Sequence, residues 1–352
     1  MENLDRTKII KLQSEKGDKC NPKVAALGGG TGLSTLLRGL KKYQADLTAV
    51  VTVADNGGSS GMLREDLNIL PPGDIRNCIL ALAQTEPLMF ELMNFRFPKD
   101  KGRLAGQNFG NLFIAAMSEV SGSFYDAVRN MSQVLAVKGK VLPVSLENIN
   151  IGAVFSDGTA VEGECIIGER TDYKIKNIER IFMKPSGAKP LMESCKEIEN
   201  ADIIVLGPGS LYTSIMPNLL FPEIRSALIR SGGVKIYVAN IMTQPSETYN
   251  YSLENHLEAI RKVFSYENPN NKYKGIIDYC IVNNQFPDPA TMEKYLLGDA
   301  RLVDYNNDLI NASGIKLIEA PLVKINRNGV IRHNKDLLAE IIFHIWTNHT
   351  NL

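Results

Sequence analysis

Residues 23–32 read KVAALGGGTG, a short apolar run that ends in a glycine-rich loop. Leucines follow at positions 33, 36, 37 and 40, the spacing of one helix face. The segment therefore predicts a strand, a glycine loop and a helix in direct succession. That order begins a parallel α/β unit, because the helix carries the chain back to start a second strand beside the first.

The same alternation returns further along the chain. Apolar runs over 47–53, 202–206, 234–238 and 276–282 are each followed directly by a small, polar or glycine-rich loop. Segments with helical periodicity lie between them, for example at 253–264. We expect an α/β fold with a Rossmann-like, mostly parallel sheet and helices on both faces.

The chain divides into a core and two other segments. Residues 1–22 are charged and predict a flexible N-terminal lead, whereas 23–136 and 187–352 together predict the Rossmann-like nucleotide-binding core. Residues 137–186 predict a small antiparallel β insertion. Its expected strands, two of them joined by an Asp157-Gly158 turn, cover residues 138–142, 150–155, 159–167 and 178–183.

Composition limits the classes of function. The 352 residues include 39 Lys and Arg and 39 Asp and Glu, so the formal net charge is zero. A nucleic-acid binder or a polybasic membrane-surface protein usually shows a basic balance. No apolar run reaches the roughly 18 residues of a spanning helix, and the first 22 residues lack a secretory signal. We expect a cytoplasmic protein with no nucleic-acid partner and no membrane insertion.

Cysteine and histidine do not point to a metal centre or a nucleophile. The five cysteines are scattered and form no CxxC pair, which argues against a disulfide framework and a zinc site. The four histidines lie apart from the glycine-rich loops, three of them near the C-terminus. We therefore expect ordinary core or surface histidines rather than a Ser-His-Asp enzyme.

Five loops are expected to share one site. They cover residues 28–32, 54–61, 207–214, 240–247 and 283–285, and each follows a predicted strand. The carboxyl ends of parallel strands lie on one edge of a sheet, and ligands of open α/β sheets bind in the crevice outside that edge. We expect the loops to meet there, although they are far apart in the sequence.

The first of these loops predicts phosphate binding. Glycines let backbone N–H groups approach a ligand closely, and the helix N-terminus that follows adds partial positive charge. Leu33 stands where a Walker A loop has Lys and where a dinucleotide fingerprint has its third glycine. Asp55 lies at roughly the distance of a ribose-binding acid, so NAD remains an alternative. The expected phosphate-binding residues are Gly28, Gly29, Gly30, Thr31 and Gly32.

The second loop and the helices after it offer charged and hydroxyl groups. Asp55 can hold a ribose, a metal or a sugar hydroxyl, and Arg64 and Arg76 can clamp a phosphate. Each group has a structural alternative. Asp55 can turn the chain, Ser59 or Ser60 can cap the next helix, and the arginines can be surface charges. Asp74 can cap a helix that reaches about residue 85. The candidates are Asp55, Asn56, Gly57, Gly58, Ser59, Ser60, Arg64, Asp74 and Arg76.

Three further segments supply backbone amides and carboxamides. The 207–214 loop predicts an amide-rich cradle, and the 240–244 segment has side chains that both donate and accept, which suits base or sugar recognition. Capping of the backbone is the alternative for the carboxamides here and at 107–111. The candidates are Asn108, Asn111, Gly207, Pro208, Gly209, Ser210, Tyr212, Thr213, Asn240, Thr243 and Gln244.

Together these motifs resemble the bacterial gluconeogenesis factor family of the YvcK type, which is related to the CofD-type 2-phospho-L-lactate transferases. The likeness runs in order from about residue 23 to 345. It rests on ALGGGTGLS (26–34), ADNGGSSG (54–61), PPGDIRN (71–77), FGNLF (109–113), LGPGSLYTS (206–214) and NIMTQP (240–245).

The resemblance implies a Rossmann-like nucleotide-binding core in a cytoplasmic protein. For the YvcK type it implies binding of UDP-sugars, UDP-N-acetylglucosamine among them, and a need for the protein in cell shape and wall synthesis on gluconeogenic carbon sources. No reaction is firmly assigned to that branch, whereas the CofD branch transfers a phospholactyl group from a nucleoside diphosphate carrier with Mg²⁺. The acidic position that serves acceptor and metal there matches Asp55 and Asn56, so Asp55 is the candidate catalytic and metal-binding residue.

Two departures from the family pattern bear on activity. Asn56 stands where the family usually has a second Asp, and a neutral ligand weakens a metal site. SETYNY (246–251) stands where GETDGY is usual. No catalytic base is evident in the sequence either. Together these features favour a UDP-sugar-binding factor as the first hypothesis. A Mg²⁺-dependent transferase is the second and an NAD-binding oxidoreductase the third. A homodimer is a further expectation for a long α/β chain with such an insertion.

Overall fold

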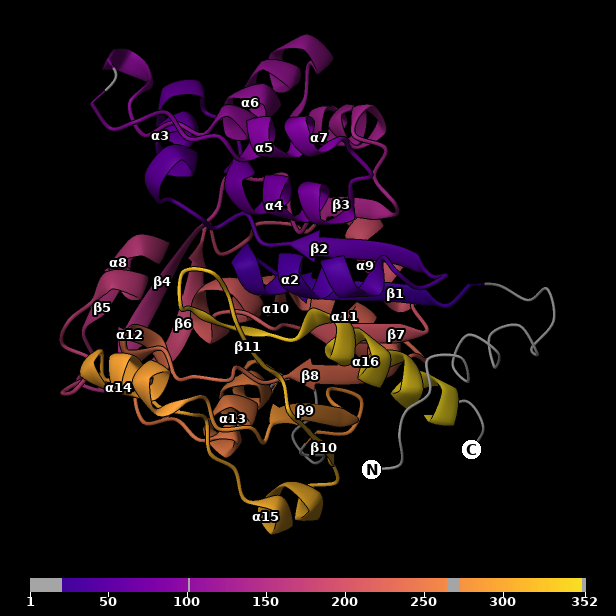
Figure 1. Ribbon diagram of the computed structural model, residues 1–352, viewed down its shortest axis with the longest axis vertical. Helices are drawn as coiled ribbons and strands as arrows, with labels where there is room; N and C mark the ends of the chain where they lie inside the picture. The colour runs from indigo at the N-terminus through magenta and orange to yellow at the C-terminus, as the bar shows by residue number, and fades with distance from the viewer. Residues whose placement is uncertain (1–20, 101, 265–272, 350–352) are drawn as a thin grey trace.

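The computed structural model describes residues 21–100, 102–264 and 273–349, along which strands and helices alternate (Figure 1). Most of the lead expected over 1–22 falls outside these ranges. Within them, no helix combines the length and the apolar character that crossing a bilayer requires.

Among the described residues, seven strands form one parallel sheet in the order β10-β9-β8-β7-β1-β2-β3. The predicted Rossmann-like sheet is therefore confirmed. Apolar residues dominate these strands because both faces of the sheet are covered. The strands are β1 (Lys23–Gly28), β2 (Asp46–Val51), β3 (Lys140–Pro143), β7 (Ile203–Leu206), β8 (Val234–Val238), β9 (Tyr279–Asn283) and β10 (Lys316–Ala320).

The strand order reverses between β1 and β7. The chain runs outward from β1 through β2 to β3, then returns to place β7 on the other side of β1 and continues outward to β10. Such a reversal leaves a crevice at the carboxyl ends of the two central strands, because their connections depart in opposite directions. The glycine-rich loops at 28–32 and 207–209 follow these two strands.

A hydrophobic core lies on each face of the sheet. Alternate residues of β1 point to opposite faces, so Val24 and Ala26 join one core and Ala25 and Leu27 join the other. Helices cover both faces, as predicted. The core with Val24 and Ala26 includes residues of α2 (Gly30–Leu40), α4 (Pro72–Leu82), α7 (Phe124–Val134) and α16 (Lys335–His349). The core with Ala25 and Leu27 includes residues of α9 (Met192–Glu199), α11 (Pro222–Arg230) and α13 (Leu253–Val263).

The segment over 137–186 differs from its prediction. The strand expected at 138–142 is β3 of the main sheet, parallel to β2, because so short an apolar run carries no sign of its partner. The strand expected at 159–167 is cut short, because Gly163, with φ of +116°, turns the chain into a helix. The antiparallel sheet has the order β5-β4-β6. These elements are β4 (Asn150–Phe155), β5 (Ala160–Glu162), α8 (Glu164–Glu169) and β6 (Ile178–Lys184).

Between β2 and β3 the chain builds a layer of helices, residues 58–134, that we call the helical lobe (Figure 1, top). The helical periodicity at 109–120 correctly predicts α6. Asp74 lies in the first turn of α4 rather than at its cap, because α4 already begins at Pro72. Besides α4 and α7, the lobe contains α3 (Gly58–Leu67), α5 (Pro87–Asn94), the 3₁₀ helix η1 (Gly102–Leu104) and α6 (Phe109–Ser121).

The C-terminal third completes the edge of the sheet. A short antiparallel hairpin, β11–β12, precedes α16, and β12 contacts α2. In Figure 1 this hairpin reaches toward the carboxyl end of the sheet. The remaining elements are the π-helical turn η2 (Leu211–Ile215), α10 (Met216–Leu219), α12 (Pro245–Thr248), α14 (Pro289–Leu297), α15 (Asn307–Ala312), β11 (Val323–Ile325) and β12 (Ile331–His333).

Candidate functional site

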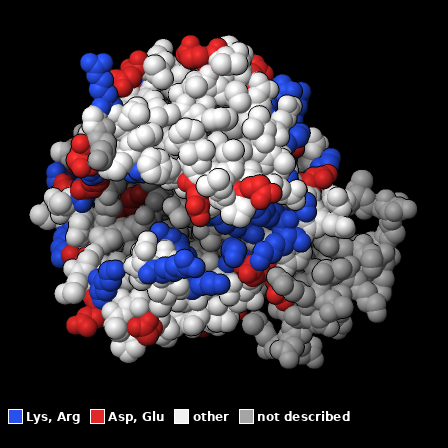
Figure 2. Space-filling view, turned by 45° about the horizontal axis from the view of Figure 1, so that its top comes forward, with Lys and Arg blue, Asp and Glu red and all other residues white. Residues whose placement is uncertain are grey.

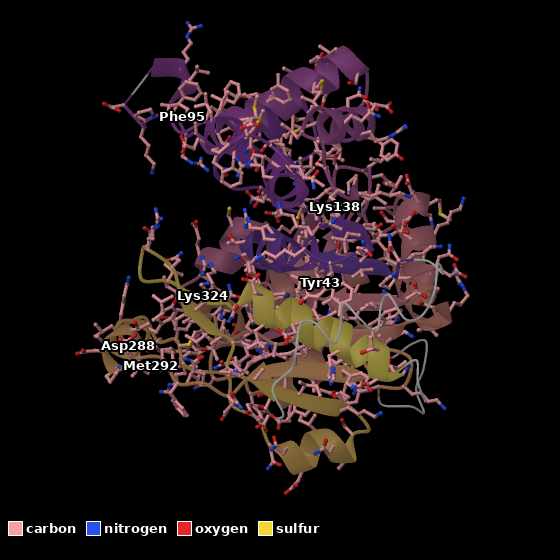
Figure 3. The ribbon with its side chains drawn as sticks, turned by 45° about the vertical axis from the view of Figure 1, so that its right-hand side comes forward. Tyr43, Phe95, Lys138, Asp288, Met292 and Lys324 are labelled. Carbon is pink, nitrogen blue, oxygen red and sulfur yellow. The ribbon has the colours of Figure 1, made fainter. Side chains whose placement is uncertain are left out.

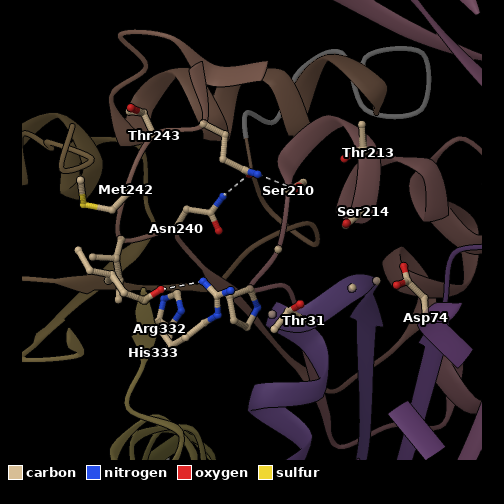
Figure 4. Close-up of a pocket in the computed structure, with 18 of the residues that line it drawn as sticks. Thr31, Asp74, Ser210, Thr213, Ser214, Asn240, Met242, Thr243, Arg332 and His333 are labelled. Atoms are coloured by element: carbon tan, nitrogen blue, oxygen red, sulfur yellow. Dashed lines mark hydrogen bonds between the residues drawn. The ribbon is translucent and has the colours of Figure 1, made fainter. Parts of the chain in front are cut away.

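A cavity of about 470 Å³ lies at the strand reversal (Figure 4). Four of the five loops that were expected to converge line it, those after β1, β2, β7 and β8. The loop at 283–285 does not, so that expectation is wrong: it follows β9, two strands away from β7. The predicted residues that line the cavity are Gly29, Gly30, Thr31, Gly32, Asp55, Asp74, Pro208, Gly209, Ser210, Thr213, Asn240, Thr243 and Gln244.

The glycines of the first loop allow chain segments to touch. A Cβ at Gly32 would lie 2.3 Å from the Pro208 carbonyl oxygen, and a Cβ at Gly29 would lie 2.7 Å from a carboxyl oxygen of Asp74. Gly30 has φ of +61°, a left-handed conformation that other residues disfavour. The glycines therefore bring the β1 loop against the β7 loop and α4, and the cavity opens where these three segments meet.

Helix α2 directs its N-terminus at the cavity. Gly30, Thr31 and Gly32 form its first turn and line the cavity, while the N-cap is Gly29, which has no side chain to bond the helix amides. The Gly30 N–H donates to the Asp74 carboxyl group. The next N–H groups and the partial positive charge of the helix end favour an anion.

Three carboxyl groups line the same cavity. Burial, together with the Asp55 carboxylate, raises the pKa of Asp74 to about 7, and the hydrogen bond from Gly30 opposes this shift. Burial, with smaller contributions from Asp55, Glu247 and Asp74, raises the pKa of Glu164 to about 8. Near pH 7 the site therefore retains protons that exposed carboxyl groups release. A cation or a ligand that accepts hydrogen bonds would relieve the repulsion among these groups.

Asp55 lines the cavity, whereas the next residue, Asn56, does not. Oδ1 of Asp55 accepts the Gly57 N–H at 2.9 Å, whereas Oδ1 of Asn56 accepts the Cys165 N–H at 3.0 Å and ties α8 to this loop. The described residues include no group of three His, Cys, Asp or Glu side chains placed to hold a metal ion. Asp55 and Asp74 are the carboxylates that can contact a cation carried by a ligand.

A buried glutamate holds the β7 loop in position. Glu247, from α12, accepts the Tyr212 N–H at 2.9 Å and the Thr213 hydroxyl at 2.8 Å. Burial raises the pKa of Glu247, and these hydrogen bonds act in the opposite direction. Tyr212 itself is buried behind the loop, and its hydroxyl pairs with that of Tyr251 at 3.0 Å. The 246–251 segment therefore holds in place the β7 loop, which lines the cavity.

Carboxamides connect the β8 loop to the β7 loop. Nδ2 of Asn240 donates to Oε1 of Gln244 at 3.3 Å, and Nε2 of Gln244 donates to the Ser210 hydroxyl at 2.8 Å (Figure 4). These two hydrogen bonds fix the orientation of both carboxamides without a ligand. In Figure 4 the Asn240 oxygen faces the open centre of the cavity, where it can accept a hydrogen bond.

Arg332 and His333 line the cavity from β12, and neither was predicted. In the view of Figure 4 both lie on the same side of the cavity as Thr31, and β12 contacts α2. Nη1 of Arg332 donates to the Ile331 carbonyl at 2.9 Å, and Nε2 of His333 donates to the Ala239 carbonyl at 3.0 Å. Burial lowers the pKa of His333 to about 4, so its ring is neutral. The expectation that the histidines lie apart from the glycine loops is wrong for His333, because the hairpin folds back over the sheet edge.

The sequence offered a faint sign of this hairpin. Asn328-Gly329 is a hairpin signal, and Gly329 has φ of +71°. Of the described residues that line the cavity, Arg332 alone carries a fixed positive charge. The other lining residues that sequence reasoning missed are Thr52, Glu164, Ser214, Ile241, Met242, Tyr295 and Ile331.

Four predicted site residues hold the helical lobe together instead of lining the cavity. The Ser59 hydroxyl donates to Gln107 at 2.7 Å and accepts from the Asn108 N–H and from Nδ2 of Asn111, both at 3.1 Å. Arg76 donates to Oδ1 of Asn111 at 2.8 Å, and burial lowers the pKa of Arg76 to about 10. We call these five residues the internal polar network. Their mutual bonds explain both asparagines without a ligand.

Arg64 and Ser60 also turn inward. The Arg64 guanidinium donates to the carbonyls of Asp55 at 3.4 Å and Ile149 at 2.6 Å, which joins the β2 loop to the residue that precedes β4. The Ser60 hydroxyl accepts the Gly73 N–H at 3.1 Å. The other predicted residues that do not line the cavity are Gly28, Asn56, Gly57, Gly58, Gly207 and Tyr212.

Known proteins share this sequence and fold. Residues 24–323 match the family described as 2-phospho-L-lactate transferase CofD. The gluconeogenesis factor of Bacillus subtilis is 43% identical over 321 residues, 91% of this chain and 97% of that protein. The gluconeogenesis factor of Halalkalibacterium halodurans is 42% identical over 319 residues, 91% of this chain and 95% of that protein.

A solved structure extends the likeness to three dimensions. The crystal structure of a UPF0052 family member from Bacillus halodurans has a TM-score of 0.84 at 42% identity, covering 92% of this chain and 99% of that one. The residues matched to the CofD family include every cavity loop after β1, β2, β7 and β8, and they end before β12. The chain therefore belongs to the CofD family, and within it to the gluconeogenesis factors.

Proposed function

We propose that the protein binds a nucleoside diphosphate sugar, of the UDP-N-acetylglucosamine kind, in the cavity at the strand reversal. The observation that carries the proposal is the meeting of two packed glycine loops, the N-terminus of α2 and the Arg332 guanidinium around one cavity. Backbone N–H groups at a helix end and a guanidinium both suit a diphosphate.

The lining groups divide the cavity by chemistry. Thr31, in the first turn of α2, and Arg332, in β12, both line the cavity and offer donors for phosphate oxygens. Asn240 offers a carbonyl oxygen to a base or an acetamido group. Glu164, with a pKa of about 8, and Asp74, with a pKa of about 7, can donate hydrogen bonds to a sugar hydroxyl in their protonated forms. This division supports a ligand with a charged middle and polar ends.

Within the gluconeogenesis factor family, we infer a regulatory role for this chain. It acts as a cytoplasmic factor that binds a UDP-sugar and is needed for cell shape and wall synthesis during growth on gluconeogenic carbon sources. The family membership supports the metabolic setting. Asn56 stands where the family usually has a second carboxylate, and its Oδ1 accepts the Cys165 N–H, which supports binding rather than turnover.

A Mg²⁺-dependent transferase that acts on a nucleotide-activated group is the second candidate. The description of the matched family names a transferase, and Asp55, Asp74 and Glu164 bring three carboxyl groups to one cavity. Carboxylate oxygens are ligands that Mg²⁺ prefers. In this alternative Asp55 and Asp74 would hold the ion, which supplies neutralising charge to a diphosphate.

Calorimetric titration with product analysis tests both candidates. The purified full chain is titrated with UDP-N-acetylglucosamine, UDP and NAD, each with and without Mg²⁺. Micromolar binding of a sugar nucleotide that stays intact supports the binding factor. Cleavage or transfer that requires Mg²⁺ supports the transferase, and binding of NAD without binding of the UDP-sugar contradicts both.

A further inference from the structure

The antiparallel part of the chain contributes one side chain to the cavity. We call residues 150–184, which run from the start of β4 to the end of β6, the antiparallel segment. Of the described residues that line the cavity, Glu164 alone comes from this segment. It is the first residue of α8 and follows Gly163, where the chain turns out of β5. The glycine loops belong to the parallel sheet, so Glu164 is a separate addition to the site.

Close packing fixes α8 against the loop that follows β2. Oδ1 of Asn56 accepts the Cys165 N–H at 3.0 Å. A Cβ at Gly57 would lie 2.6 Å from Sγ of Cys165, and a Cβ at Gly163 would lie 3.0 Å from Nδ2 of Asn56. The loop and the start of α8 therefore leave no room for an added side chain at Gly57. Because Cys165 adjoins Glu164, Asn56 holds the backbone that places Glu164 in the cavity.

The surroundings of Glu164 are acidic. Among the described residues its hydrogen-bond partner is the Cys165 thiol, and the charged groups that act most strongly on it are the carboxyl groups of Asp55, Glu247 and Asp74. Burial and these groups raise the pKa of Glu164 to about 8. Figure 2 shows a hollow below the helical lobe with acidic atoms inside it. In its protonated form Glu164 offers one hydrogen-bond donor and one acceptor to a ligand.

The basic side of the cavity lies away from these carboxyl groups. In Figure 4, Arg332 and Asp74 stand on opposite sides of the cavity, with Thr31 between them. The hairpin supplies Arg332 and α4 of the helical lobe supplies Asp74. Figure 3 shows the lobe, marked by Phe95, above the hairpin, marked by Lys324. A diphosphate is favoured on the side of Arg332, because an anion beside the carboxyl groups would add to their repulsion. The carboxyl side then suits an uncharged sugar.

We propose that Glu164 is the specificity-determining residue for the sugar part of the ligand, through a hydrogen bond to a hydroxyl or acetamido group, and that Asn56 is the positioning residue that holds it there. The inference rests on the proposed function and assigns recognition of the sugar to the antiparallel segment. Specificity of this kind is a difference between two affinities, so two ligands have to be compared in each variant.

Calorimetric titration of the full chain with UDP-N-acetylglucosamine and with UDP, at pH 7 without Mg²⁺, tests the role of Glu164. Glu164→Ala is expected to lower the affinity for the UDP-sugar about 10-fold and that for UDP less than about 2-fold, because UDP lacks the sugar. Glu164→Leu, which keeps bulk without a hydrogen-bonding group, is expected to behave alike. Glu164→Gln keeps a donor and an acceptor and is expected to retain both wild-type affinities.

The control for these variants is Glu169→Ala, since Glu169 is exposed on the same helix and does not line the cavity. It is expected to bind both ligands as the wild type does. Thermal unfolding by circular dichroism verifies that each variant folds.

The same two ligands test the positioning role of Asn56. Asn56→Ala removes the acceptor of the Cys165 N–H and is expected to lower the affinity for the UDP-sugar about 5-fold without a matching change for UDP. Asn56→Asp keeps that acceptor and is expected to restore the affinity.

Two kinds of result separate this inference from the proposed function. If Glu164→Ala and Glu164→Leu lose equal affinity for both ligands, or lose none, the inference is overturned while the proposed function stands. A wild type that binds neither ligand would overturn the proposed function, and the inference with it.

Discussion

The cavity and the internal polar network lie close together at the carboxyl edge of the sheet, and they differ in how their polar groups are satisfied. In the network, hydrogen bonds of 2.8 and 3.1 Å join Arg76 and Ser59 to Asn111. In the cavity, burial and neighbouring charge raise the pKa values of Asp74 and Glu164. Polar groups that bond one another, such as Ser59 and Asn111, are structural, whereas a ligand from outside the chain can relieve buried carboxyl groups that repel one another.

The largest expected effect is on the pH dependence of stability in Asp74→Asn. The pKa of Asp74 rises from 3.8 to about 7 on folding, so as pH rises the unfolded chain releases this proton first. Its contribution to the free energy of unfolding is therefore greatest below pH 4 and falls by about 1.4 kcal/mol per pH unit until about pH 7. Urea denaturation from pH 4 to 8 measures this slope.

Asp74→Asn removes the slope and is expected to be more stable than the wild type at pH 8. Asp46→Asn, at an exposed strand end, is the control and is expected to keep the wild-type slope. If the free energy of unfolding changes with pH equally in Asp74→Asn and in the wild type, the folded chain holds no extra proton at Asp74. The cavity would then not differ from the internal polar network in this respect.

Arg332→Ala tests whether the cavity holds a phosphate group. We expect the affinity for UDP-N-acetylglucosamine to fall about 100-fold, because a charge-assisted contact contributes about 2–3 kcal/mol. The melting temperature is expected to change little, since the guanidinium donates only to the adjacent Ile331 carbonyl among the described residues. Arg327→Ala, in the same hairpin, is the control. Equal losses in both variants would indicate long-range charge rather than a direct contact.

Asn111→Ala tests the other side of the comparison. The substitution leaves Arg76 and Ser59 without a shared partner, and we expect the free energy of unfolding to fall by about 2 kcal/mol. Ligand affinity measured by calorimetry is expected to stay unchanged. Asn200→Ala, exposed at the end of α9, is expected to cost under about 0.5 kcal/mol. A loss of affinity without a loss of stability would make the network part of the site.

Gly209→Ala gives the smallest expected effect. A Cβ there lies 3.4 Å from Cβ of Ser214 and 3.6 Å from the Gly29 carbonyl oxygen, so the loop accommodates the methyl group while the cavity narrows. We expect affinity for the UDP-sugar to fall about 10-fold with stability within about 0.5 kcal/mol of the wild type. Gly232→Ala, whose Cβ meets no described atom within 4 Å, is the control. Full affinity in Gly209→Ala would place the ligand away from this loop.

Local pattern was sufficient to predict the main features of the fold. The glycine loop after residues 23–27 predicted the β1–α2 unit, because helix periodicity and glycine content are properties of short segments. The convergence of four loops followed from strand parallelism alone. Pattern was wrong about β3, since a four-residue strand pairs according to contacts with β2 that lie far away in the sequence.

Residue type by itself could identify polar loops but not the direction of their side chains. Ser59 and Ser210 both stand in loops rich in glycine and serine, yet Ser59 bonds Asn108, 49 residues away, and Ser210 lines the cavity. Arg332 reaches the cavity only because a hairpin folds back beside α2. The sequence determined the sheet, its glycine loops and the edge at which they meet, because these follow from short-range periodicity. The tertiary structure decided which polar groups satisfy one another and which face the cavity, because that depends on long-range packing.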